Sequence, residues 1–109
     1  MFFVLKNYFS RDCLNNLIEV NKTEIKLGEH GTIFLFKIYK IVFVYVSVYS
    51  AIDIKNIIPE MYRPLLTSRN FISDYLSNVA TFTISTDGDV KTIKVDNSNY
   101  VGSFCYFTL

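Results

Sequence analysis

The sequence has little charge, histidine, cysteine, glycine or proline. Only 19% of its 109 residues are charged and the formal net charge is +1, so its charge balance does not favour nucleic-acid binding. Its one histidine, His30, lies in a Gly-Glu-His-Gly loop with no second histidine or nearby cysteine. This pattern contains no metal-ligand spacing, and we expect His30 to be a solvated loop residue.

The two cysteines allow two interpretations. Cys13 and Cys105 lie far apart in the sequence, and a disulfide between them would join the two ends of the chain. Two separate buried thiols are the alternative that we favour, because free cysteine behaves as a small hydrophobic residue.

Apolar residues, in contrast, are abundant. They make up 50% of the chain, and aromatic residues make up 17% although tryptophan is absent. A chain of this composition builds a hydrophobic core, which excludes an intrinsically disordered protein. A small domain with this many aromatic residues also has apolar surface left over, which such domains often bury against copies of themselves.

The most apolar segment, residues 32–52, is long enough to be a membrane-spanning helix. Lys37 and Lys40 lie near its middle, where a charge is costly, and its valine, isoleucine, phenylalanine and tyrosine favour strands. We therefore expect no membrane insertion. The first nine residues have no basic region and too short an apolar run for a signal peptide.

The same segment predicts two strands joined tightly at Tyr39-Lys40. Val42, Val44, Val46 and Val48 alternate along the second strand, so they share one face and are expected to be buried. Phe43, Tyr45 and Tyr49 share the opposite face, which we expect to contact a neighbouring subunit or sheet.

The rest of the chain also indicates short strands. Residues 1–16 fit either a strand or a short helix, and 17–27 fit one or two strands around an Asn21-Lys22 turn. Residues 79–95 are typical of a hairpin, with Asp87-Gly88 at its turn, and 100–109 end in a strand. Seven or eight short strands without a convincing long helix predict an all-β sandwich or barrel.

Signatures of enzymatic chemistry are missing. The sequence has no G-x-S-x-G pattern, phosphate-binding loop or dinucleotide fingerprint. Residues 86–89, Thr-Asp-Gly-Asp, resemble the start of a calcium loop but lack the later carboxylates, and a β-turn explains them. We expect no enzymatic activity, no cofactor and no metal.

Both prolines of the chain fall in the segment IIPEMYRP, residues 57–64. Pro59 and Pro64 fix their own φ angles and favour extended geometry in the residues before them. We predict a corner between two sheets, with a turn at Glu60-Met61, an extended exit, and the Tyr62 ring at the edge of the core. Arg63 is expected to bond carbonyl groups or an acidic neighbour.

This corner resembles the L-P-x-G-Y-R-P motif in the C-terminal head domains of tail-fibre and receptor-binding proteins from phages and prophages of Gram-positive bacteria. The valine strand before it, the hairpin FTISTDGDVKTIKV and the final GSFCYFTL match that family in order and spacing. The resemblance covers about residues 30–109. Met61 stands where the family has glycine, which suggests a turn without positive φ.

The resemblance implies a domain organisation and a function. Residues 1–29 would be an N-terminal segment and a possible anchor, and 30–109 a jelly-roll head that forms a homotrimer. Such a head would lie at the tip of a phage tail or fibre in the virion, joined to other tail or baseplate proteins, and would bind host cell-wall polysaccharide. The alternatives are a trimeric structural cap that binds nothing, and an unrelated β-protein.

Two polar loops combine aromatic rings with planar polar side chains, which suits saccharide binding. They supply six candidate ligand-binding residues: Asp74, Tyr75, Asn78, Asn97, Asn99 and Tyr100. Asparagine, aspartate and serine are also the usual residues of turns, so a purely structural role remains the alternative. The corner residues Pro59, Tyr62, Arg63 and Pro64 are expected to be structural and not to contact a ligand.

Overall fold

The computed structural model describes residues 20–93 and 98–109, which form strands and two short 3-10 helices. The all-β fold class is therefore confirmed for this part of the chain. The strands are β1 (Val20–Lys26), β2 (Gly31–Ile38), β3 (Ile41–Val48), β4 (Asp53–Ile54), β5 (Ser68–Ser73), β6 (Val79–Ile84), β7 (Val90–Ile93) and β8 (Tyr100–Phe107). The 3-10 helices are η1 (Gly28–His30) and η2 (Glu60–Tyr62).

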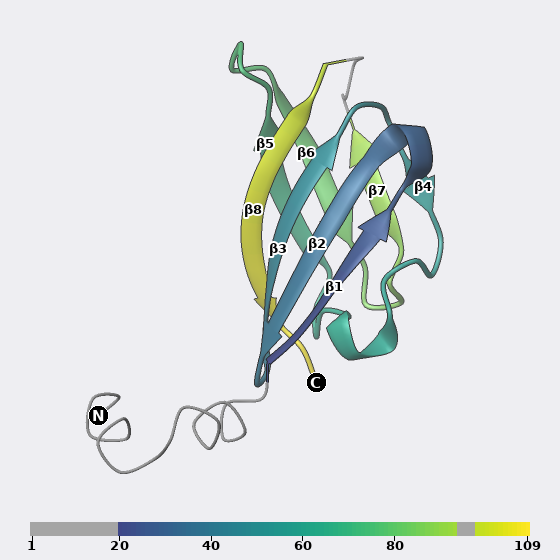
Figure 1. Cartoon of the computed structure of the whole chain (residues 1–109), viewed down its shortest axis with the longest axis vertical. Helices are drawn as coiled ribbons and strands as arrows, with labels where there is room; N and C mark the ends of the chain where they lie inside the picture. The colour runs from purple at the N-terminus through teal and green to yellow at the C-terminus, as the bar shows by residue number, and fades with distance from the viewer. Residues whose placement is uncertain (1–19, 94–97) are drawn as a thin grey trace, which may run out of the picture.

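All eight strands belong to one antiparallel sheet with the order β1-β2-β3-β8-β5-β6-β7-β4. The sheet curls so that β5, β6, β7 and β4 lie behind β1, β2, β3 and β8 (Figure 1). The two halves are joined through β5 and β8, where Ser73 is paired with Val101. The predicted corner therefore does not lead from one separate sheet to another. It leads from the edge strand β4 to β5, in the middle of the same sheet.

The core lies between the two halves of the curled sheet. The valines of β3, at positions 42, 44, 46 and 48, are all buried, which confirms the predicted face. Ile33 and Leu35 of β2 extend this layer, and Phe82 and Ile84 of β6 face it from the other half. Residues 32–48 form the two predicted strands with their tight Tyr39-Lys40 turn, and no helix in the described ranges is long and apolar enough to cross a membrane.

β1 differs from the prediction for residues 17–27. The described part, from Val20 onward, is one uninterrupted strand without a turn at Asn21-Lys22, paired with β2 from Val20 opposite Ile38 to Lys26 opposite Thr32. A complete ladder on β2 outweighs the local turn preference of an Asn-Lys pair. β1 is thus an integral part of the sheet, while the predictions for residues 1–16 fall outside the described residues.

The corner has the predicted local geometry. Pro59 is extended, with φ −59° and ψ 147°, η2 forms the turn, and Arg63 leaves it extended, with φ −74° and ψ 141°. Met61 is not among the described non-glycine residues with positive φ. This agrees with the expectation of a turn without positive φ at this position. The Tyr62 ring is buried.

Side chains of β8 and its C-terminal extension hold the corner in place. The Tyr106 hydroxyl donates a hydrogen bond of 2.5 Å to the Tyr62 carbonyl, and the Thr108 hydroxyl donates one of 2.6 Å to the Arg63 carbonyl. Burial raises the pKa of the Tyr106 hydroxyl well above its ordinary value, so this donor keeps its proton.

The β6–β7 hairpin holds the corner from the other side. The Gly88 carbonyl accepts hydrogen bonds from the backbone N–H groups of Ile57 and Ile58, at 3.0 and 3.1 Å. Arg63 Nε donates to the Ile58 carbonyl at 2.9 Å, which confirms the expectation that Arg63 bonds a carbonyl group. The proline corner and the Asp-Gly hairpin therefore form one interlocked unit.

Candidate functional site

The first candidate loop, residues 74–78, connects β5 to β6 and is organised by its own aspartate. Asp74 is buried, and its carboxylate accepts bonds from the backbone N–H groups of Leu76 (3.0 Å) and Asn78 (2.8 Å). The Asn78 side-chain amide donates to the same carboxylate at 3.0 Å. Asp74 and Asn78 thus hold the loop, whereas Tyr75 projects from it with 86% of its surface exposed.

The residues of the second candidate loop differ in their exposure and in their contacts. Asn99 is exposed, and its side-chain oxygen accepts a hydrogen bond of 3.0 Å from the Ser47 hydroxyl at the end of β3. Tyr100 is the first residue of β8 and is only 2% exposed, so its ring belongs to the core. Asn97 lies outside the described residues.

The fold nevertheless brings the described parts of both loops to one end of the sheet. Ser73, immediately before the first loop, is paired with Val101, immediately after Tyr100. Both segments lie at the end opposite the corner (Figure 1). Tyr75, Asn78 and Asn99 are the exposed candidates there, although the Asn78 amide is bonded to Asp74. Saccharide binding at these loops stays a prediction.

A larger feature is an exposed aromatic face on the outer side of β2 and β3. Cross-strand pairing places Phe34 beside Tyr45 and Phe36 beside Phe43, with ring centroids 6.0 and 6.3 Å apart. Between 38% and 46% of each of these four residues is exposed. We call Phe34, Phe36, Phe43 and Tyr45 the aromatic face.

Neighbouring strands extend this aromatic face and give it a charged margin. A groove of about 580 Å³ runs over it, with Lys22 and Glu24 of β1 on one side and Ser103 of β8 on the other. Cys105 is opposite Phe43 on β8 and is a free, exposed thiol, so the expectation of a buried Cys105 was wrong. The error arose because alternation along β8 places Tyr106, not Cys105, on the inner face.

The sequence signal for Phe43, Tyr45 and Tyr49 was the alternation along residues 41–49. Phe43 and Tyr45 are exposed on the outer face of β3, and Tyr49, which follows β3, is also exposed. Phe34 and Phe36 were not singled out. The same period-two alternation was present in β2, where Ile33 and Leu35 are the buried partners.

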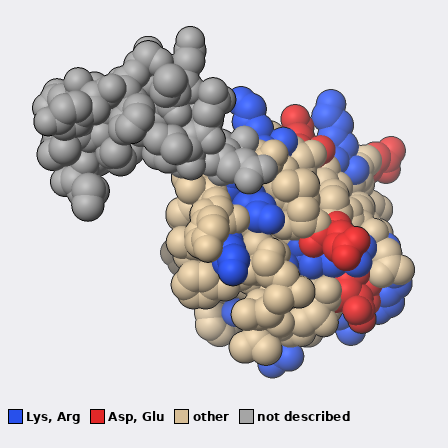
Figure 2. Space-filling view, turned by 90° about the horizontal axis from the view of Figure 1, so that it is seen from below, with Lys and Arg blue, Asp and Glu red and all other residues tan. Residues whose placement is uncertain are grey.

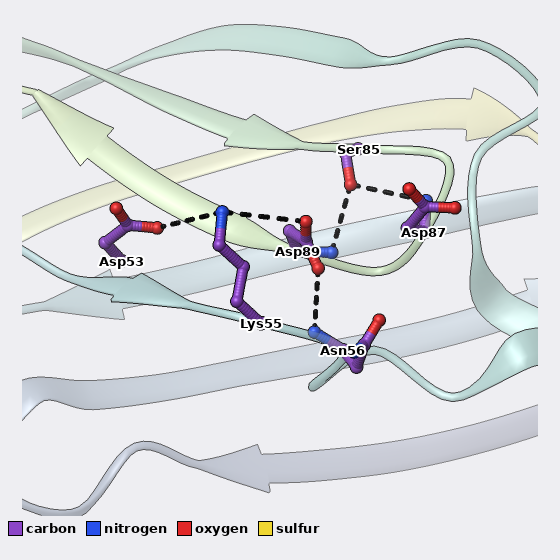
Figure 3. Close-up of polar contacts among 6 residues, drawn as sticks. All are labelled: Asp53, Lys55, Asn56, Ser85, Asp87 and Asp89. Carbon is purple, nitrogen blue, oxygen red and sulfur yellow. Dashed lines mark hydrogen bonds and ion pairs between the residues drawn. The ribbon is translucent and has the colours of Figure 1, made fainter.

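The carboxylates of Asp89, next to the β6–β7 turn, and of Asp53, on β4, have partners within the fold (Figure 3). Asp89 accepts a hydrogen bond of 2.8 Å from the Asn56 backbone N–H, and Lys55 lies within 3.6–3.7 Å of carboxylate oxygens of both Asp53 and Asp89. The Ser85 hydroxyl accepts bonds from the backbone N–H groups of Asp87 and Asp89. Within residues 20–93 and 98–109, no group of three or more potential ligand side chains could hold a metal ion.

His30 is exposed, as expected, and its Nδ1 hydrogen-bonds with the Ser50 hydroxyl. On the face of the molecule seen in Figure 2, Lys and Arg side chains lie next to Asp and Glu side chains at several places and form no continuous field of one sign. Neither feature provides a catalytic arrangement.

The chain matches no family model, and no curated protein is significantly similar to it.

Proposed function

We propose that this chain is a jelly-roll-like head domain of a phage tail-fibre or receptor-binding protein. It acts as a homotrimer in the virion, where it joins other tail or baseplate proteins and recognises host cell-wall polysaccharide. The observation that carries the proposal is the exposed aromatic face on a compact all-β sheet.

The motifs behind the family resemblance support the proposal because they act together. The corner and the Asp-Gly hairpin, which lie apart in sequence, are hydrogen-bonded through Gly88, Ile57 and Ile58. The final strand β8 supplies Tyr106 and Thr108 to the same corner. The corner, the hairpin and the final strand, which carry the resemblance, therefore belong to one structural unit.

The aromatic face supports self-association. Four neighbouring, partly exposed rings on one sheet face form an apolar patch with a polar margin, and surfaces of this kind can mark protein–protein contacts. Burying apolar surface stabilises an interface by roughly 25 cal/mol per Å². Lys22 and Glu24, opposite charges at its margin, are suited to fix the orientation of neighbouring subunits.

Replacing Phe43 with glutamate is expected to convert the trimer into a monomer, because a carboxylate in the centre of the interface loses its hydration. Light scattering coupled to size-exclusion chromatography measures the mass. The matched control is Phe71→Glu, since Phe71 is 77% exposed on the outer side of the other half-sheet. A wild-type chain that is monomeric at high concentration would remove the basis for the fibre-tip proposal.

Replacing Tyr75 with alanine is expected to weaken binding to host cell-wall polysaccharide roughly tenfold, or by about 1.4 kcal/mol. An exposed tyrosine ring is the surface on which a sugar stacks, and the Asp74 bonds keep the loop intact without it. Asn99→Ala should act in the same direction. Binding is measured by pull-down and calorimetry with purified wall polysaccharide.

The control for the Tyr75 variant is Tyr39→Ala. Tyr39 is also an exposed turn tyrosine (75%), but it lies in the β2–β3 turn, at the end of the sheet opposite the candidate loops. Equal binding by the Tyr75 variant and the parent protein would exclude this loop as the site. Tyr100→Ala tests core packing and not binding, because Tyr100 is buried. A trimer that binds no wall fraction would instead favour a structural cap.

A further inference from the structure

The curled sheet ends in two edge strands of very different length. β4 forms one edge with two residues, whereas β1 forms the other with seven. β1 contains no proline, and its register with β2 runs from Val20 to Lys26 without a bulge. Short strands, prolines and bulges are devices that keep sheet edges from pairing with other chains, and β1 has none of them.

The ladder between β1 and β2 shows which backbone groups of β1 point outward. The Leu27 N–H donates to the carbonyl of its β2 partner Gly31 at 2.8 Å. Backbone groups of an antiparallel strand point to alternate sides, so Thr23 bonds β2 while Lys22 and Glu24 direct their N–H and C=O groups to the outer edge. Among the described residues, no strand pairs with that outer edge.

The charges along this edge match those of a second β1 strand in one arrangement. Lys22, Glu24 and Lys26 are exposed and alternate with partly buried residues. In an antiparallel pair of two β1 strands centred on Thr23, Lys22 of each copy lies opposite Glu24 of the other. Centring the pair on Lys22 or on Glu24 instead places like charges opposite each other, which destabilises a sheet.

The arrangement centred on Thr23 also uses the whole of β1. Val20 of one copy lies opposite Lys26 of the other, so every residue of the strand has a partner. Centring on Ile25 pairs opposite charges as well, but then only Glu24–Lys26 of the two strands overlap. Charge and strand length together therefore select one register.

We propose that the outer edge of β1 pairs with the same edge of a second copy of this chain, antiparallel, with Thr23 opposite Thr23. The two sheets join into one around a two-fold axis, and both copies contribute the same residues. A single edge contact is small and therefore transient. On a dilute size-exclusion column, the Phe43→Glu variant is still expected to elute as a monomer.

This contact goes beyond the proposed function and does not depend on it. The proposed trimer uses the aromatic face on β2 and β3, and the proposed saccharide site uses the loops after β5 and before β8. The β1 contact uses backbone groups at the edge of the sheet. It is therefore tested in the Phe43→Glu variant, in which the proposed trimer contact is removed.

Disulfide trapping tests the register in the full chain carrying Phe43→Glu, Cys13→Ser and Cys105→Ser. Thr23→Cys is expected to give a covalent dimer in oxidised glutathione, seen on a non-reducing gel. The two Cα atoms at the two-fold axis would be about 4.5 Å apart, which a disulfide can bridge. The matched control is Lys26→Cys, which is more exposed but about 20 Å from its copy along the strands, and it is expected to react at least tenfold more slowly.

Exchanging the charges tests their part in the pairing. Glu24→Lys, added to the Thr23→Cys chain, places lysines opposite each other and is expected to slow dimer formation about tenfold. Lys22→Glu should have the same effect, because it places carboxylates opposite each other. A chain with both changes again has opposite charges across the pair, and it is expected to regain the rate of the Thr23→Cys chain.

Hydrogen exchange provides a readout without cysteine variants. In the Phe43→Glu chain, the outward-pointing amides of Lys22 and Glu24 are expected to exchange more slowly as protein concentration rises. The amides of Thr23 and Ile25, which already bond β2, should keep their exchange rates.

Three results would each overturn the proposal. The first is a Thr23→Cys chain that forms dimers no faster than the Lys26→Cys control. The second is faster trapping of Ile25→Cys, which would show the other register. The third is exchange at Lys22 and Glu24 that does not change with concentration.

Discussion

Replacing Tyr62 with alanine is expected to lower the free energy of unfolding by roughly 3–5 kcal/mol. The ring is 5% exposed and packs in the core cluster at the bend between β4 and β5. Its removal leaves a cavity beside a backbone that β8 and the β6–β7 hairpin hold from both sides, so little collapse can fill it. Urea denaturation monitored by circular dichroism measures the loss.

Tyr62→Phe is the matched control. Within the described residues no hydrogen bond involves the Tyr62 hydroxyl, so phenylalanine keeps the ring and is expected to change stability by less than about 1 kcal/mol. An alanine variant with unchanged stability but lost polysaccharide binding would show that Tyr62 contacts the ligand and that its structural assignment is wrong.

Gly88→Ala should destabilise the protein through two separate effects. Gly88 has φ +83°, a left-handed conformation that costs other residues roughly 1–2 kcal/mol. A Cβ atom would also lie 2.6 Å from the Ile58 carbonyl oxygen and 2.6 Å from Arg63 Nε, two atoms that are hydrogen-bonded to each other. The corner and the hairpin would have to separate.

Gly28→Ala isolates the conformational part. Gly28 also has positive φ, +63°, but no atom lies within 4 Å of the Cβ position. The difference between the two variants in thermal or urea unfolding therefore measures the contact, and we expect at least about 1 kcal/mol. Equal losses would mean that the interlock between corner and hairpin adds no stability.

Local signals predicted most of the fold. The alternation of Val42 to Val48 defined both faces of β3, and the Asp87-Gly88 pair located the hairpin turn, because these patterns depend only on neighbouring residues. The corner was also predictable, since proline fixes its own backbone and restricts the residue before it.

Features that depend on distant partners were not predicted. The turn expected at Asn21-Lys22 is absent because β2 offers β1 a complete ladder. Likewise, the corner stays within one sheet because the pairing of Ser73 with Val101 joins the two halves. Neither pairing leaves a signal in the segments themselves.

In the candidate site, too, local sequence predicted some features, whereas features that depend on distant residues were not predicted. Composition identified the two polar loops, and the fold brings their described parts to one end of the sheet. Composition did not reveal that Asp74 is engaged within its own loop or that Tyr100 is buried.

The central position of β8 has a consequence for how the chain folds. β1–β2, β2–β3, β5–β6 and β6–β7 are neighbours in sequence and can pair early as local hairpins. β8 lies between β3 and β5. Its pairing with β3 brings together Ile41 and Phe107, which are separated in sequence by most of the described chain. Loop closure on this scale is slow, so the arrival of β8 is expected to be the rate-limiting step of folding. Until β8 is in place, the β1–β3 half of the sheet would expose the valine face of β3, which is buried in the native state.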